Sequence, residues 1–127
     1  MVMETINRPK TRLSIALFLS AFLVVSLSAC APAKLDVSNV TAIIDTRSPS
    51  EFAKGHIVGA VNFQYIPYVF VASVTQLNRK GVYYVYGKNA DEAGKAATDL
   101  QSLGITQVTN LGNYDDAQHV LPLGVTK

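Results

Sequence analysis

The chain offers few side chains for nucleophilic or metal chemistry. Its one cysteine is Cys30, and its two histidines are His56 and His119. A single cysteine can form neither an intramolecular disulfide nor a multi-cysteine zinc site. Neither histidine has a spaced cluster of cysteines or acids beside it, so we expect His56 to be a packed, hydrogen-bonded residue. We therefore expect no metal site and no cofactor.

Asp91 and Glu92 are adjacent acids that follow an apolar run. Acid pairs can perform general acid–base catalysis, for example in a hydrolase. Asn89, however, stands three residues before Glu92, which is the spacing of a capping pair at a helix start. A helix dipole also favours carboxylates in its first turn. We expect both acids to face solvent at the start of a helix, and a hydrolase that uses them is an alternative.

Residues 1–29 have the pattern of a bacterial export signal. Three basic residues lie between positions 8 and 12, and the uncharged, mainly apolar segment Leu13–Leu27 follows them. The segment ends in Leu-Ser-Ala-Cys at residues 27–30, which resembles the lipobox of bacterial lipoproteins. The resemblance implies cleavage before Cys30, a diacylglyceryl thioether on its sulfur, and an amino terminus acylated by a fatty acid such as palmitate.

This resemblance places the mature chain on a membrane through its lipids. Ala31 follows the cysteine, and it is not the Asp that accompanies retention in the inner membrane. In a cell with two membranes, the outer membrane, with the domain facing the periplasm, is therefore favoured. The uncharged stretch 13–33 has 21 residues, and about 20 suffice to span a bilayer. An uncleaved transmembrane anchor is therefore the alternative.

The sequence divides into three segments. These are a signal peptide (1–29), the lipidated cysteine with a short tether (30–38), and one small domain (39–127). The whole chain has 127 residues, which allows no more than one domain of ordinary size. Three of the 11 basic residues and one of the nine acidic residues precede Cys30, so the net charge of the mature chain is zero. Such a chain has no bulk attraction to nucleic acid, and we expect no nucleic-acid partner.

The domain alternates between predicted strands and predicted helices. β-Branched and apolar runs predict strands at 40–44, 61–63, 81–86 and 106–111. Helical spacing and capping signals predict helices at 48–54, from Pro67 to Leu77, at 93–103 and, weakly, at 114–120. A turn is expected at residues 112–113. Alternation of this kind is typical of an α/β domain with a central parallel sheet flanked by helices.

Three motifs stand in the order and spacing of the amino-terminal signature of rhodanese-like domains. They are Asp45-Thr46-Arg47 at a strand end, Glu51-Phe52 on a helix, and Gly55–Asn62, which reads GHIVGAVN. The chain resembles this family over residues 38–117, and in size it is similar to the small periplasmic rhodaneses of the phage-shock type. The resemblance implies a rhodanese-like three-layer α/β fold. Its structural motif residues are Asp45, Arg47, Glu51, Gly55, His56, Gly59, Ala60 and Asn62.

Rhodaneses move sulfane sulfur from thiosulfate to an acceptor through a persulfide on a cysteine. In the family this cysteine begins a Cys-x-x-Gly-x-Arg loop between the central strand and the next helix. The resemblance places Gly87 at the cysteine, Ala90 at the loop glycine and Glu92 at the arginine. The vestigial loop consists of Gly87, Lys88, Asn89, Ala90, Asp91 and Glu92. Glycine has no side chain to act as a nucleophile, so we expect no catalytic residue in this loop.

These residues favour a membrane-anchored binding or interaction module without sulfurtransferase activity. Its partner would be an unidentified envelope protein or a small anion. Three aromatic residues that follow the second strand, Tyr65, Tyr68 and Phe70, are candidates for the rim of its cleft. An active thiosulfate sulfurtransferase is the alternative, but it requires a thiol in the mature domain. Cys30 does not supply that thiol if its sulfur is a thioether.

Overall fold

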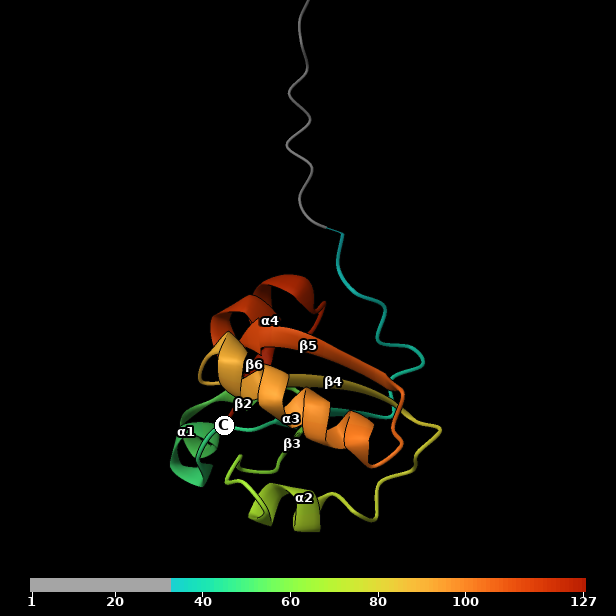
Figure 1. Ribbon diagram of the computed structural model, residues 1–127. Helices are drawn as coiled ribbons and strands as arrows, with labels where there is room; N and C mark the ends of the chain where they lie inside the picture. The colour runs from blue at the N-terminus through green and yellow to red at the C-terminus, as the bar shows by residue number, and fades with distance from the viewer. Residues whose placement is uncertain (1–32) are drawn as a thin grey trace, which may run out of the picture.

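A computed structural model describes residues 33–127, which form an α/β fold around a four-stranded parallel sheet (Figure 1). The strand order is β3-β1-β4-β5, and a two-stranded antiparallel sheet of β2 and β6 lies beside it. In chain order the elements are β1 (Ala42–Asp45), α1 (Pro49–Lys54), β2 (His56–Ile57), β3 (Ala60–Asn62), α2 (Val69–Ser73), β4 (Val82–Gly87), α3 (Ala90–Ser102), β5 (Gln107–Asn113), α4 (Tyr114–Val120) and β6 (Val125–Thr126). The predicted fold class is confirmed.

Two hydrophobic clusters lie on opposite faces of the sheet. On one face α2 and α3 pack on β1 and β4, with Phe70 and Leu100 fully buried. On the other face α1, α4 and β2 pack around Ile57 and Tyr86. Every residue of both clusters lies between Leu35 and Leu123. Residues 33–127 therefore contain both cores, and we expect this segment to fold on its own.

The first helix follows its predicted signals closely. Ser48 accepts a hydrogen bond from the backbone of Glu51, whose side chain returns to the backbone of Ser48, and Pro49 occupies the first turn. The helix ends at Lys54, before Gly55. The predicted capping box is confirmed, because each signal in it is local and needs no tertiary contact.

Two other predicted boundaries are wrong. The helix expected to reach Leu77 is only Val69–Ser73; it has no side-chain cap, and its β-branched residues favour helix weakly. The turn expected at residues 112–113 is instead the end of β5. Gly112 takes a φ of 83°, and Asn113 caps α4 by accepting a hydrogen bond from the backbone of Asp116.

Within residues 33–127, no helix combines the length and hydrophobicity needed to cross a bilayer. The predicted signal peptide and Cys30 lie outside the described residues.

A buried ion pair joins the end of β1 to both neighbouring helices. Asp45 is fully buried, and Nη2 of Arg47 lies 2.7 Å from its Oδ2. The same nitrogen donates to the carbonyl of Gly55, 2.7 Å away, at the end of α1. The guanidinium lies 4.0 Å from the ring centroid of Tyr114 on α4. Asp45 and Arg47 are thus linked within one motif, and the link also holds α1 and α4 against the sheet edge.

Replacing Arg47 with Ala should destabilise the domain strongly. The change leaves the carboxylate of Asp45 buried and unpaired, which costs about 3–5 kcal/mol. Urea unfolding of the 33–127 fragment measures the loss. The matched control is Lys95→Ala, which breaks the exposed pair with Asp91 and should leave the midpoint nearly unchanged. Equal midpoints for the two variants would contradict a structural role for the buried pair.

Candidate functional site

The loops that follow β1, β3 and β4 meet at the carboxyl edge of the parallel sheet. The backbone N–H of Thr46 donates to the carbonyl of Tyr86, 2.9 Å away, and the N–H of Tyr65 donates to the carbonyl of Thr46, also at 2.9 Å. These bonds connect the loops after β1 and β3 to each other and to the end of β4. The carboxyl edge of an open α/β sheet is where such folds bind their ligands. It is also where the predicted vestigial loop lies.

Gly87 is the last residue of β4 and is buried. A Cβ atom placed there would lie 2.7 Å from Oγ1 of Thr46, 3.0 Å from Oε1 of Glu92 and 3.3 Å from the backbone nitrogen of Ala93. Gly87 is not among the residues of the described chain with positive φ. The backbone therefore tolerates other residues at this position, but the space that a side chain needs is already occupied.

The carboxylate of Glu92 fills that space. Its Oε1 lies 3.1 Å from the hydroxyl of Thr46 and 3.4 Å from the backbone N–H of Lys88. Its Oε2 lies 3.5 Å from the ammonium of Lys88, and only 12% of the side chain is exposed. The expectation that Glu92 faces solvent is therefore wrong. The side chain turns inward because a hydroxyl, an amide, an ammonium and the positive end of α3 all attract a carboxylate.

The side chain of Asp91 lies in solvent at the start of α3. Its carboxylate pairs with Lys95 at 2.8 Å, and its side chain is 75% exposed, as the sequence predicts. The two acids therefore diverge, with Asp91 in solvent and Glu92 in the loop. Asn89 caps α3, since its Oδ1 accepts from the N–H of Glu92 at 2.8 Å. The reciprocal bond of a capping box, from the backbone of Asn89 to the side chain of Glu92, does not form. The carboxylate of Glu92 instead contacts Thr46 and Lys88.

Thr46 was not singled out by the sequence, yet it is central to this arrangement. Its hydroxyl lies 3.1 Å from both the carbonyl of Tyr86 and Oε1 of Glu92, and it donates its one hydrogen to either. Thr46 directly follows a buried strand, and Gly87 ends another strand at the same edge of the sheet. This position is the signal that could have identified Thr46 as a site residue. No composition or motif indicates which neighbour it contacts.

The remaining motif residues hold the sheet edge. Asn62 donates to the carbonyls of Asp45 and Arg47 at 3.0 and 2.9 Å. Hydrogen bonds from the side chain and backbone of Ser48 lower the pKa of Glu51. Gly59 takes a φ of 81°, a conformation that favours glycine, and Ala60 is buried beside it.

His56 also has structural contacts. Its ring stacks on Phe52 with centroids 3.6 Å apart, and Nδ1 lies 2.8 Å from the carbonyl oxygen of Phe52. Within residues 33–127, no group of three His, Cys, Asp or Glu side chains could hold a metal ion.

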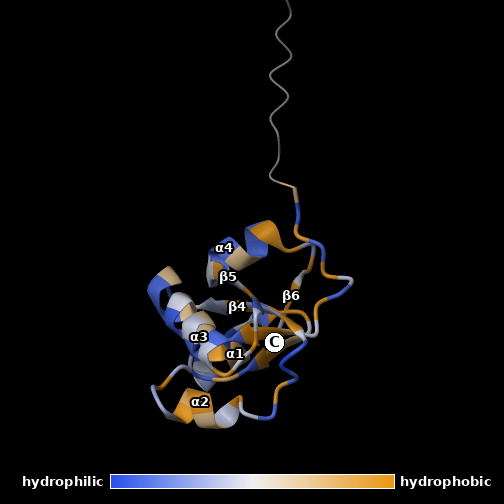
Figure 2. Cartoon of the chain, turned by 45° about the vertical axis from the view of Figure 1, so that its right-hand side comes forward, coloured by the Kyte–Doolittle hydropathy of each residue, from blue (hydrophilic) through white to orange (hydrophobic). Residues whose placement is uncertain are grey.

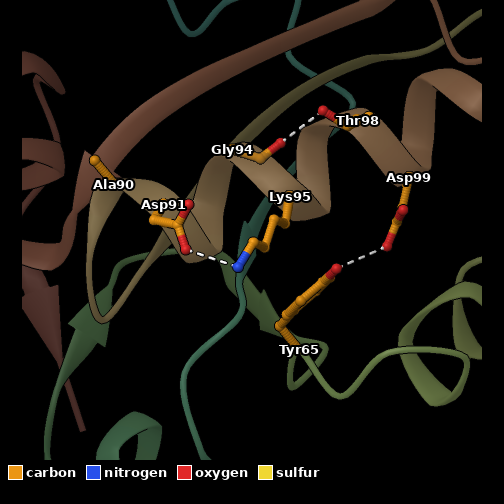
Figure 3. A pocket seen from close by; sticks show the side chains of 7 residues that line it. All are labelled: Tyr65, Ala90, Asp91, Gly94, Lys95, Thr98 and Asp99. Carbon is orange, nitrogen blue, oxygen red and sulfur yellow. Dashed lines mark hydrogen bonds and ion pairs between the residues drawn. The ribbon is translucent and has the colours of Figure 1, made fainter.

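The three aromatic residues expected to rim the cleft lie in different environments. Phe70 is fully buried in the core, so its prediction as a rim residue is wrong. Tyr65 borders a shallow depression of about 460 Å³ on the outer side of α3 (Figure 3). Its hydroxyl donates to Asp99 at 3.1 Å, and partial burial followed by this hydrogen bond raises the pKa of Tyr65. The polar groups of the depression are thus paired with one another. Tyr68 is 90% exposed.

Comparisons with known proteins agree with this architecture. A domain of the Anabaena sp. Alr3790 protein, described as Rhodanese_3-like, has a TM-score of 0.59 and 25% identity over 68% of this chain and 98% of that domain. An E. coli rhodanese solved with anions has a TM-score of 0.54 over 68% of this chain and 96% of its own, but its 23% identity supports the fold alone.

A curated relative is the uncharacterized protein YqhL of Bacillus subtilis (strain 168), which is 36% identical over 70 residues. The match covers 54% of this chain and 53% of YqhL, so the chain spans about half the length of this relative. The model of the Rhodanese-like domain matches residues 30–116. This match covers more than half of the chain, and the chain therefore belongs to the family of rhodanese-like domains.

Proposed function

We propose that this chain is a membrane-anchored, envelope-facing rhodanese-like domain that acts as a binding module and does not transfer sulfur. The observation that carries the proposal is the environment of Gly87. The residue at the family's cysteine position has no side chain, and the carboxylate of Glu92 lies 3.0 Å from where its Cβ would be. A persulfide needs both a thiol and an anion-stabilising loop. In this chain the groups that would stabilise a sulfur anion bind the chain's own carboxylate instead.

The E. coli rhodanese in the comparison was solved with anions. We propose that Glu92 takes the role of such an anion here, with Thr46 and Lys88 as its partners. A resident carboxylate repels a thiolate and raises the pKa of any neighbouring thiol. The absence of a thiol at Gly87 and the presence of the Glu92 carboxylate beside it therefore both support a binding module that does not transfer sulfur.

Family membership favours a second candidate, a thiosulfate sulfurtransferase. This candidate needs a nucleophile other than a cysteine of the domain, because the only cysteine of the chain precedes residue 33. The hydrolase alternative is weaker, since Asp91 and Glu92 point in different directions and do not form an acid pair.

The 33–127 fragment should produce no thiocyanate from thiosulfate and cyanide above the rate without protein. The physical reason is that this fragment contains no thiol that could accept sulfur. Colorimetric detection of thiocyanate measures the rate, with an active rhodanese as the positive control. A rate that rises with the concentration of the fragment would exclude the binding-only proposal.

Gly87→Cys alone should remain nearly inactive, and activity should appear in Gly87→Cys combined with Glu92→Ala. The second substitution removes the negative charge and the contact with Oε1 of Glu92, while the contact with the hydroxyl of Thr46 remains. We expect at least about tenfold more thiocyanate from the double variant. The matched control is Gly87→Cys with Asp91→Ala, which removes an acid whose exposed side chain pairs with Lys95. If both double variants are equally active, Glu92 does not occupy the anion site.

Membrane anchoring through Cys30 can be tested in the full chain. Bacteria that express it in the presence of labelled palmitate should incorporate label into the protein, and Cys30→Ser should abolish the label. The reason is that Cys30 is the only cysteine that can receive the diacylglyceryl group. An unsubstituted chain that stays in the membrane but incorporates no label would instead support the uncleaved anchor.

A further inference from the structure

The segment around α2 is the least charged part of the domain. From Ile57 to Asn78 the chain contains no Lys, Arg, Asp or Glu. Much of α2 is hydrophobic, and the helix lies at the end of the domain away from α4 (Figure 2). The exposed residues of this segment therefore contribute no charge to the surface, whereas the surface of a small domain normally mixes both signs of charge.

Large apolar side chains are exposed on this segment. Ile66 is 45% exposed, Val69 is 54% exposed, and Tyr68 is 90% exposed. Together with Pro67 they form four consecutive residues, which we call the α2 face. Hydrogen bonds from the N–H of Phe70 to the carbonyl of Ile66 (2.8 Å) and from Val69 to Pro67 (2.8 Å) hold the segment in place. The α2 face is therefore a fixed apolar surface, and such surfaces mark sites of interaction.

Tyr68 gives a second, independent indication. Its φ is 67°, and within the described residues it is the only residue other than glycine with a positive φ. This conformation is costly for a residue with a Cβ atom, and such costs concentrate where a side chain has a function. Tyrosine is also one of the residue types that contribute most to the binding energy of protein interfaces.

We propose that the α2 face is the interface of a symmetric dimer, with a second copy of this chain as its occupant. A twofold interface brings the same surface of both copies together, so every charged residue near the axis would meet its own sign. The uncharged segment Ile57–Asn78 avoids this repulsion.

The charge of the whole domain agrees with such a dimer. Residues 33–127 carry eight basic and eight acidic side chains, so two copies do not repel each other through net charge. The position of the face also leaves it accessible. Leu35 is hydrogen-bonded to Val120 at the end of α4, and α2 lies at the opposite end of the domain (Figure 1). The proposal is independent of whether the domain transfers sulfur.

Sedimentation of the 33–127 fragment over a wide concentration range tests the proposal. We expect a monomer–dimer equilibrium, and we expect Tyr68→Asp and Val69→Asp each to raise the dissociation constant at least about tenfold, since each places two carboxylates opposite each other. Thr98→Asp, on the exposed outer side of α3, is the matched control and should not change the constant. Circular dichroism checks that the variants fold. Because Tyr68 and Val69 are exposed, we expect neither substitution to disrupt the fold.

Crosslinking provides a second measurement that needs no charge substitution. The fragment contains no native cysteine, so Tyr68→Cys should yield a disulfide-linked dimer on oxidation, and Thr98→Cys should not. A fragment that stays monomeric at every concentration would overturn the proposal, as would a dimer that neither aspartate weakens. A monomer that binds phosphatidylcholine vesicles through Tyr68 would also overturn it, and would assign the face to a lipid surface.

Discussion

The carboxylate of Asp45 has no exposure to solvent, and the structure around the sheet edge depends on how it is neutralised. Arg47 forms the ion pair and also contacts the end of α1 and the ring of Tyr114 on α4. One guanidinium thus connects β1 and α1 to α4, which lies about 60 residues later in the chain. A lysine could neutralise the charge, but its single ammonium lacks the planar group that bonds two oxygens and stacks on an aromatic ring. The geometry of the strand end, and with it the loop that contains Gly87, rests on this pair.

The same edge combines residues that organise the backbone with a loop whose polar groups hold a carboxylate. The residues that organise the backbone keep their structural contacts, as the bonds of Asn62 and the stacking of His56 show. In the loop after β4, a carboxylate lies where backbone amides and a helix start would attract an anion. The residues that organise the backbone at this edge therefore differ from those that surround the carboxylate of Glu92.

Much of the fold could be predicted from local signals, but less of the site could. Alternating strands and helices, the capping box at Ser48 and the link between Asp45 and Arg47 are encoded within a few residues of one another. The two-residue strands β2 and β6 were missed, since they exist only because distant segments pair. Phe70 was misplaced because aromatic residues suit a rim and a core equally well. The inward turn of Glu92 depends on Thr46, 46 residues earlier in the chain, and no sequence spacing reveals that contact.

The attachment of the first described residues to α4 has a mechanical consequence. Leu35 donates to the carbonyl of Val120 at 2.8 Å, Lys34 contacts the carbonyl of His119, and the hydroxyl of Tyr84 donates to the carbonyl of Asp36 at 2.7 Å. A force applied to the chain before residue 33 therefore acts first on the hydrogen bonds of Lys34, Leu35 and Asp36, which can break one after another. The force acts on β1, and through it on the sheet, after these hydrogen bonds have broken. Because Leu35 and Val37 also pack against the cluster around Ile57 and Tyr86, pulling this segment away exposes part of that core.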